Sequence, residues 1–298
     1  MKLSYEKCCL CPRNCSINRE KAVGWCKESS KVKVARSALH FFEEPSISGE
    51  NGSGTIFFSG CNLACCYCQN QKISLGHLGK EISVERLSEL MLELQEKKAH
   101  NINLVTPTHF IPSIIEALTI AKKKGLKIPI VYNTSGYESV DTLRMLNGYI
   151  DIYLTDFKYF DNQLGEDLSG CKNYFEVASQ ALEEMQRQVG KNKFTKDGMM
   201  RKGVIVRCLL LPTKANDMKK VIYYLHQKYQ NDIYLSIMNQ YTPVVHQDIY
   251  TYLNQTVSKE EYEDVIQYAI HLGVKKAYVQ EDGTQDESFI PDFDLSLL

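Results

Sequence analysis

Four cysteines lie within eight consecutive residues of the stretch FFSGCNLACCYCQN (57–70), directly after a short apolar run. Cys61, Cys65 and Cys68 follow the spacing CxxxCxxC. Three thiolates can ligate three irons of a [4Fe–4S] cluster and leave the fourth iron open to a non-protein ligand. A structural zinc site would need a fourth ligand, and only Cys66 is close enough in the sequence. Because Cys66 adjoins Cys65, its side chain should point elsewhere, and we interpret it as a small buried filler.

A second group of thiols lies near the N-terminus. Cys8, Cys11, Cys15 and Cys26 form CxxCxxxC followed by one more cysteine, and we interpret Cys9 as spare. Four thiolates within nineteen residues would fold this short segment around a metal. Zinc and an auxiliary iron–sulfur cluster both fit four cysteines, so the sequence leaves the metal open. The alternative is a set of redox-inert thiols near the chain end.

The composition places these thiols in a globular protein. The chain has 298 residues, of which 44% are hydrophobic and 24% charged, and nine of its eleven cysteines precede residue 70. No apolar stretch approaches the length of a membrane span, and the first residues resemble no secretory signal. We therefore expect a reducing, cytoplasmic compartment, in which clustered thiols hold metal rather than form disulfides. The formal net charge of −1 indicates no bulk attraction to nucleic acid or to membranes.

From residue 55 onward, short apolar runs alternate with amphipathic segments. The runs are rich in Ile, Val and Tyr on both faces, which is typical of parallel strands covered by helices. Six strand-then-helix units predict an α/β fold, a partial (β/α)6 barrel over residues 51–298, preceded by a cysteine-rich segment and connector over 1–50. The expected strands are 55–60, 101–106, 127–133, 151–157, 203–212 and 232–238.

Caps support the predicted helices. Ser83 is placed to cap a helix whose apolar residues recur at three-and-four spacing, and SKEE (258–261) is a capping box before a helix that ends near Gly273. The polar stretch 190–203 is most simply an exposed loop.

Polar residues follow the predicted strands where each one ends. In a parallel barrel these positions share one rim with the cysteine loop, and polar residues on the rim of an apolar sheet are the expected lining of a binding site. The residues are Asn103 to His109, Asn133 to Ser135, Asp156 to Lys158, Arg207, and Met238 to Tyr241. The alternatives are that Asp156 and Lys158 form an ordinary surface ion pair and that His109 caps a helix.

This pattern resembles the radical S-adenosylmethionine (SAM) superfamily: CxxxCxxC with an aromatic residue, here Tyr67, before the last cysteine, after the first strand of a β/α barrel. The resemblance implies that the open iron chelates the methionine end of SAM. It also implies that one electron from the cluster cleaves the sulfonium, giving a 5′-deoxyadenosyl radical that abstracts hydrogen.

Longer motifs resemble a subgroup, the PflX-type proteins, which are related to pyruvate formate-lyase activating enzyme. They include CxLCPRxC, EEPxISGxxGSGTIFFSGCNLxCxYCQN, NINxVTPTHF, PIVYNTSGYE, DIYLxDFKY and MxQYxP. By this resemblance, Tyr67 and Asn70 lie near the adenine and the cluster. Asn133, Thr134 and Ser135 approach the ribose and methionine, Asp156 and Lys158 engage the methionine end, and Arg207 helps to hold SAM. Gln240 and Tyr241 are expected to line the pocket.

Two positions depart from the activating enzymes. Where those proteins carry Gly-Gly-Glu for the methionine ammonium, this chain reads LVTPTHF, so Asn103, Thr106, Thr108 or His109 would take that role. Cys208 stands where the subgroup tends to have histidine after the arginine. We expect Cys171 and Cys208 to be structural, and Cys208 is also the one candidate for a catalytic side chain.

These observations predict a radical SAM oxidoreductase. The relatedness favours activation of a glycyl-radical enzyme, with an external reductant such as flavodoxin or ferredoxin as partner. No glycyl-radical motif occurs in this chain, so the substrate must come from outside. The alternatives are radical modification of a small molecule or peptide and, in another class, a non-catalytic iron–sulfur electron carrier or redox sensor.

Overall fold

A computed structural model describes residues 4–75, 78–280, 291, 293, 295 and 298 of the chain. The centre of the fold is one sheet in the order β10-β9-β8-β6-β5-β4-β2-β1-β3, with β7 paired to β8. Neighbouring strands from β2 to β10 are parallel, whereas β1 and β3 pair antiparallel at one edge. The strands are β1 (Lys33–His40), β2 (Ser53–Phe58), β3 (Lys80–Glu81), β4 (Ile102–Val105), β5 (Ile130–Thr134), β6 (Ile152–Asp156), β7 (Lys193–Phe194), β8 (Met200–Leu209), β9 (Tyr234–Met238) and β10 (Ala277–Val279).

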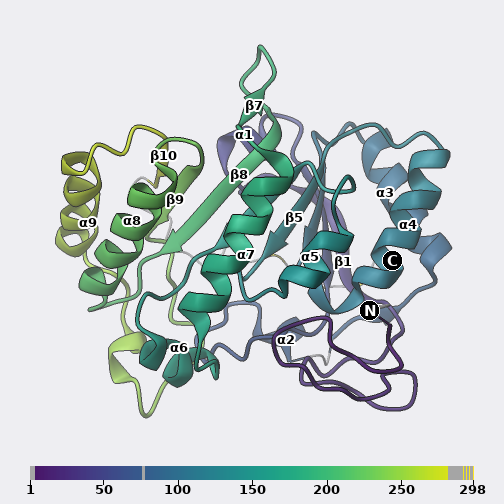
Figure 1. The fold of residues 1–298 in the computed structure, drawn as a ribbon, viewed down its shortest axis with the longest axis horizontal. Helices are drawn as coiled ribbons and strands as arrows, with labels where there is room; N and C mark the ends of the chain where they lie inside the picture. Colours follow the sequence, from purple (N-terminus) through teal and green to yellow (C-terminus); the bar gives the residue numbers. More distant parts are fainter. Residues whose placement is uncertain (1–3, 76–77, 281–290, 292, 294, 296–297) are drawn as a thin grey trace.

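Helices cover the convex face of this sheet, as Figure 1 shows from their side. The helices in the described part of the chain are α1 (Pro45–Ser48), α2 (Gln71–Ser74), α3 (Val84–Glu96), η1 (Thr108–Phe110), α4 (Ile111–Lys123), α5 (Val140–Met145), α6 (Asn162–Ser169), α7 (Tyr174–Val189), α8 (Ala215–Tyr229), η2 (Thr251–Asn254) and α9 (Lys259–His271). No helix in the described part of the chain is long and apolar enough to cross a membrane.

The predicted helix starts are confirmed. Ser83 accepts a hydrogen bond from the amide of Arg86, and Ser258 accepts one from the amide of Glu261. Such caps satisfy amide groups that have no partner within the helix, each contributing about 1 kcal/mol. The buried residues of α3 lie on one face, where they pack against the sheet.

Part of the predicted connector adds a strand to the sheet and covers its inner face. Lys33–His40 forms strand β1, and α1 places Ile47 among the buried side chains of Val131, Ile152 and Ile205. Burying a side chain of this size stabilises the fold by roughly 1.5–3 kcal/mol. Residues 33–50 therefore belong to the barrel, because β1 pairs with β2 and α1 fills the interior.

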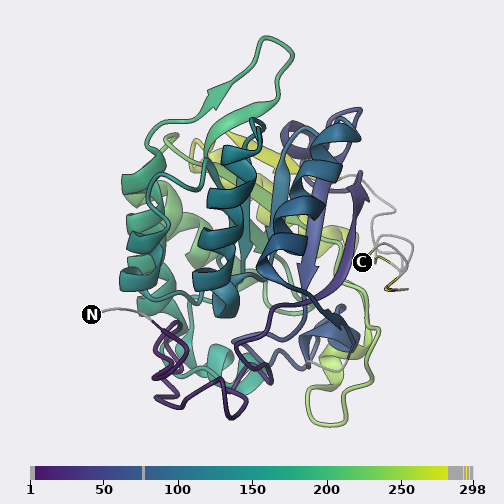
Figure 2. The ribbon, with the colours of Figure 1, turned by 90° about the vertical axis from the view of Figure 1, so that its right-hand side faces the viewer.

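The prediction of an exposed loop over 190–203 was wrong in part. Lys193–Phe194 and the start of β8 pair antiparallel, so much of this stretch is a hairpin. Its polar composition reflects exposure rather than irregular structure. The hairpin extends from one end of the molecule, and the N-terminal segment lies at the opposite end (Figures 1 and 2).

Candidate active site

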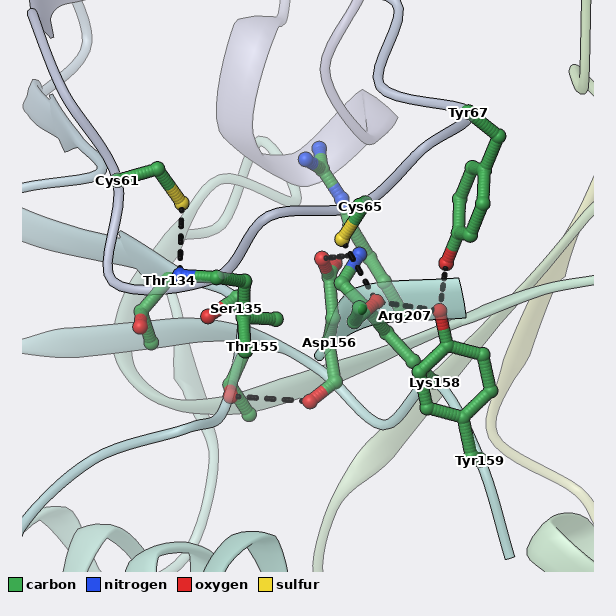
Figure 3. A network of polar contacts seen from close by, with 12 residues as sticks. Cys61, Cys65, Tyr67, Thr134, Ser135, Thr155, Asp156, Lys158, Tyr159 and Arg207 are labelled. Atoms are coloured by element: carbon green, nitrogen blue, oxygen red, sulfur yellow. Dashed lines mark hydrogen bonds and ion pairs between the residues drawn. The ribbon is translucent and has the colours of Figure 1, made fainter. Parts of the chain in front are cut away.

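A cavity of about 420 Å³ opens at the carboxyl ends of the parallel strands. Nearly all the residues predicted for the site line it: Cys61, Cys65, Tyr67, Cys68, Asn70, Thr106, Asn133, Thr134, Ser135, Asp156, Lys158, Arg207, Gln240 and Tyr241. They converge because parallel strands bring their carboxyl ends to one rim. Figure 3 shows the core of this group.

The three cysteines of the CxxxCxxC motif face the cavity, and Cys66 is not among the described residues that line it. The Cys66 amide donates to the carbonyl of Leu168 at 2.9 Å, which turns this residue away from its neighbours. Cys66 is half-buried rather than fully buried as expected. Burial, together with the neighbouring Cys65, raises the pKa of Cys61.

The donor set fits a [4Fe–4S] cluster that one non-protein ligand completes. Three thiols at the mouth of one cavity can each bind a different iron. Within the described ranges, no three His, Cys, Asp or Glu side chains are placed as ligands of a single metal ion.

The backbone conformation of Gly60 determines how the cysteine loop leaves strand β2. Gly60 has φ +81°, and a Cβ at this position would lie 2.5 Å from the backbone oxygen of Cys26. Only glycine tolerates both the left-handed conformation and this close approach. Gly60 thus turns the chain from β2 into the cysteine loop directly against the N-terminal segment.

An ion pair stands at the end of β6. Lys158 Nζ lies 2.6 Å from Asp156 Oδ2, and both side chains are largely buried. Burial is the largest single effect and would lower the pKa of Lys158, but the neighbouring groups, Asp156 first among them, together outweigh burial and raise the pKa, so the ammonium persists. The Tyr174 hydroxyl accepts from the Lys158 amide at 2.9 Å and donates to the Ser135 carbonyl at 2.7 Å, which joins this pair to the end of β5.

Two polar atoms of the lining are buried without a hydrogen-bond partner in the described part of the chain: Asn70 Oδ1 and Ser135 Oγ. An unsatisfied buried polar atom costs roughly 1–3 kcal/mol, and such atoms are uncommon in folded proteins. A polar ligand in the cavity would satisfy them. The lining therefore fits a molecule with several hydrogen-bonding groups, as SAM has.

The LVTPTHF segment contributes Val105 and Thr106 to the cavity, and only Thr106 is polar. Thr106 lines it and has φ +57°, a conformation that strains a β-branched residue and marks functional sites. The other three proposed substitutes for Gly-Gly-Glu bond elsewhere. Thr108 donates to Glu138 Oε1 at 2.6 Å, and Asn103 Nδ2 donates to Glu43 Oε1 at 2.9 Å.

His109 is a structural residue, which resolves the alternatives left open for it. Its Nε2 lies 2.6 Å from the Ser59 carbonyl oxygen, and burial lowers the pKa of the imidazole to about 3. The ring is therefore neutral and supports the strand end that precedes Cys61.

Sequence reasoning missed two acidic residues, Glu43 and Glu44. Both carboxylates pair with the Arg207 guanidinium inside the barrel, where Arg207 Nε donates to Glu44 Oε1 at 2.8 Å. Burial would raise the pKa of Glu44, but the charge and hydrogen bonds of Arg207 outweigh it and lower the pKa. The available signal is a pair of adjacent carboxylates between Phe42 and Pro45, at the start of the motif EEPxISG in the predicted connector.

Cys208 cannot act on a molecule in this cavity. Arg207 and Leu209 line the cavity, and side chains alternate along a strand, so Cys208 faces the helices and is completely buried. The candidate catalytic role is therefore corrected: Cys208 is a core residue, as is Cys171.

The N-terminal cysteines share one neighbourhood. Residues 4–32 form turns and bends without a helix or strand. A Cβ on Gly24 would lie 3.3 Å from Cys26 Sγ and 3.8 Å from Cys15 Sγ, so both sulfurs approach this glycine. Burial raises the pKa of Cys11 to about 12, with Cys26 and Cys15 acting in the same direction.

Known proteins share these features. Residues 55–200 match the family model of the radical SAM superfamily. An uncharacterised protein of Methanocaldococcus jannaschii is 30% identical over 273 residues, which cover 89% of this chain and 75% of the relative. A second protein of this organism, named as a candidate glycyl-radical enzyme activating enzyme, is 31% identical over 109 residues, covering 37% of this chain and 44% of that protein.

Solved structures share the fold at low sequence identity. HydG, a maturase of the [FeFe]-hydrogenase, aligns with a TM-score of 0.51 and 15% identity over 77% of this chain and 52% of HydG. SuiB of Streptococcus suis, bound to its precursor peptide SuiA, aligns with a TM-score of 0.50 and 12% identity over 75% of this chain and 47% of SuiB. The chain spans about half the length of these two proteins. The cysteine loop on a parallel β/α sheet, the family match and the relative that aligns over most of the chain lead to one conclusion: this chain belongs to the radical SAM superfamily.

Proposed function

We propose that this protein is a radical SAM oxidoreductase that binds a [4Fe–4S] cluster through Cys61, Cys65 and Cys68. The supporting observation is that three thiols, and not the adjacent Cys66, border a cavity lined by unpartnered polar atoms. With SAM at its open iron, the reduced cluster would supply the electron that splits the sulfonium into methionine and a 5′-deoxyadenosyl radical, which takes a hydrogen atom from the substrate.

The chain's own residues bind and orient SAM. Lys158, an ammonium paired with Asp156, would donate hydrogen bonds to the methionine carboxylate, since charge-assisted hydrogen bonds are the strongest type. Ser135 Oγ and Asn70 Oδ1 would complete the polar contacts. The aromatic ring of Tyr67, buried at the cavity wall, would exclude water from the reacting bond.

The first experiment is SAM cleavage. After anaerobic reconstitution and reduction with dithionite, the protein should convert SAM to 5′-deoxyadenosine and methionine. A reconstituted cluster without cleavage would instead support the electron carrier or redox sensor.

The specific role proposed is activation of a glycyl-radical enzyme by hydrogen abstraction from glycine. The 109-residue similarity to a candidate activating enzyme supports it. The alternative is radical modification of a small molecule or peptide. Incubation with a glycine-deuterated cell extract distinguishes the two: deuterium in 5′-deoxyadenosine and a glycyl-radical EPR signal support the activase, and deuterium from another donor supports the alternative. A reductant such as flavodoxin or ferredoxin would supply the electron.

We also propose a second metal site formed by Cys8, Cys11, Cys15 and Cys26. A segment of 29 residues without regular secondary structure buries too little apolar surface to fold by itself, which is a common reason for a structural metal. Four thiolates suit zinc or an iron–sulfur cluster, and because no three of the described side chains are already placed around a single ion, these thiols would draw together when the metal binds. Metal analysis distinguishes them.

A further inference from the structure

Arg13, between Cys11 and Cys15, joins the N-terminal segment to the loop that carries the proposed cluster ligands. Its Nε donates to the backbone oxygen of Asn62 at 2.8 Å, and Asn62 adjoins Cys61. Its two terminal nitrogens donate to the backbone oxygens of Gly170 and Ser169. The guanidinium also stacks on the Trp25 ring, 4.3 Å from its centroid. A planar group with five donors can span two loops in this manner, and lysine cannot.

The second loop held by Arg13 supports the cysteine loop directly. Ser169 and Gly170 end α6, where Gly170 takes the left-handed conformation with φ +61°. Backbone carbonyls of this end accept hydrogen bonds from the amides of Ala64 and Cys66. The Ser169 hydroxyl, completely buried, donates to Cys65 Sγ at 2.9 Å.

Three hydroxyl groups form one chain that ends on the Cys65 sulfur. The Tyr159 hydroxyl lies 2.7 Å from Ser169 Oγ, and the Tyr67 hydroxyl lies 2.5 Å from that of Tyr159. Each hydroxyl carries one proton. Since Ser169 donates its proton to Cys65, Tyr159 must donate to Ser169, and Tyr67 must donate to Tyr159. Hydrogen bonds aligned in one direction strengthen one another.

We propose that Arg13 is a positioning residue through which the N-terminal segment holds the Ser169 hydroxyl on Cys65 and thereby sets the reduction potential of the cluster. This inference rests on the proposed cluster ligation by Cys65. A reduced cluster carries one more negative charge than an oxidised one, so a donor to its thiolate sulfur stabilises the reduced form and raises the potential. Reduction then depends on a segment that lies outside the cavity.

The test compares midpoint potentials of the reconstituted proteins, followed by absorption and EPR during redox titration. Ser169→Ala removes one hydroxyl. Arg13→Ala removes the guanidinium, and Arg13→Lys keeps the charge but loses the fork. Arg144→Ala is the matched control, because Arg144 is an exposed arginine of α5 whose side chain pairs with Asp141.

We expect Ser169→Ala to lower the midpoint potential by ~59 mV, which corresponds to a tenfold change in the one-electron reduction equilibrium. Arg13→Ala and Arg13→Lys should shift it in the same direction, and Arg144→Ala should match the wild type. If Ser169→Ala has the wild-type potential, the hydroxyl does not tune the cluster. If both Arg13 variants have the wild-type potential, Arg13 does not couple the N-terminal segment to the cluster. If Arg13→Ala takes up less iron, the potential of Arg13→Lys alone decides. A wild-type protein that binds no cluster refutes the proposed function instead.

Discussion

At the scale of single residues, the two adjacent cysteines of the loop have different environments. Cys65 faces the cavity and accepts a hydrogen bond from Ser169, whereas the backbone of Cys66 is bonded on both sides, to Leu168 and to Gln247. The sequence order alone does not distinguish two neighbouring thiols, but the hydrogen bonds do.

Cys65→Ala should remove the visible absorption of the cluster. It should also reduce 5′-deoxyadenosine formation by at least roughly 10–100-fold, which is the loss expected when only a residue that hydrogen-bonds to a metal ligand is removed. Cys66→Ala is the matched control and should retain both. Equal losses in the two variants would mean that the ligand assignment is wrong.

The ion pair of Asp156 and Lys158 should contribute to SAM affinity. Lys158→Met removes the ammonium and leaves the Asp156 carboxylate unpaired, so SAM binding measured by calorimetry should weaken by about tenfold, the value of one charged hydrogen bond. Lys219→Met, which removes the lysine of the peripheral pair with Asp264, should bind SAM as the wild type does. Unchanged SAM affinity in Lys158→Met would mean that the ion pair supports the fold and does not bind SAM.

At the scale of elements, Glu138 connects the end of β5 to η1. Thr108, Thr134 and Tyr132 all donate hydrogen bonds to its carboxyl group. Burial nevertheless raises the pKa of Glu138 to about 7, from an ordinary value of 4.5. Between pH 4.5 and about 7, the Glu138 carboxyl group is therefore protonated in the folded protein and ionised in the unfolded chain.

Because the folded state binds more protons between pH 4.5 and 7, the free energy of unfolding should fall as pH rises across this window, by roughly 3 kcal/mol in total. Glu138→Gln should lack this contribution and should be more stable than the wild type at pH 8. Urea denaturation at pH 5, 6, 7 and 8 measures it. Parallel pH profiles for the two proteins would contradict the argument.

At the scale of the whole molecule, the N-terminal segment is fastened to the barrel by buried hydrogen bonds. The Arg19 side chain is completely buried, and its guanidinium donates to the backbone oxygens of His109, Glu28 and Ser29. With Arg13, this arginine fixes the segment against the strand ends. A buried charge without a carboxylate hydrogen-bonded to it requires well-placed neutral partners, here three carbonyl oxygens and the Cys8 sulfur, so disordering the segment should affect the site.

The double substitution Cys15→Ser with Cys26→Ser should remove one metal site and lower the melting temperature by several degrees, because metal binding contributes folding free energy to such segments. Cys9→Ser should change neither, since Cys9 is not one of the four proposed ligands and its sulfur instead lies 3.8 Å from Ser16 Oγ. Zinc and iron analysis with calorimetry measures both effects. Unchanged metal content in the double variant would exclude the site.

Local patterns in the sequence were sufficient for six parallel strands, the helix caps and the thiol spacing, but not for the edge strand β1 or the short strands β7 and β10. Strand alternation, capping by Ser83 and Ser258 and the CxxxCxxC motif are properties of neighbouring residues, and the chain expresses them without long-range information. The convergence of Asn133, Asp156 and Arg207 also followed, because the carboxyl ends of parallel strands share a rim.

Only the tertiary structure decided which side chains meet across distant segments. Glu43 and Glu44 reach Arg207 over more than 160 residues, Arg13 reaches Ser169 over 156, and no periodicity relates such positions. It also turned Cys208 away from the cavity and Asn103 toward Glu43. The physical reason is that hydrogen bonds and ion pairs between remote segments depend on how the packed layers align, which local propensity does not encode.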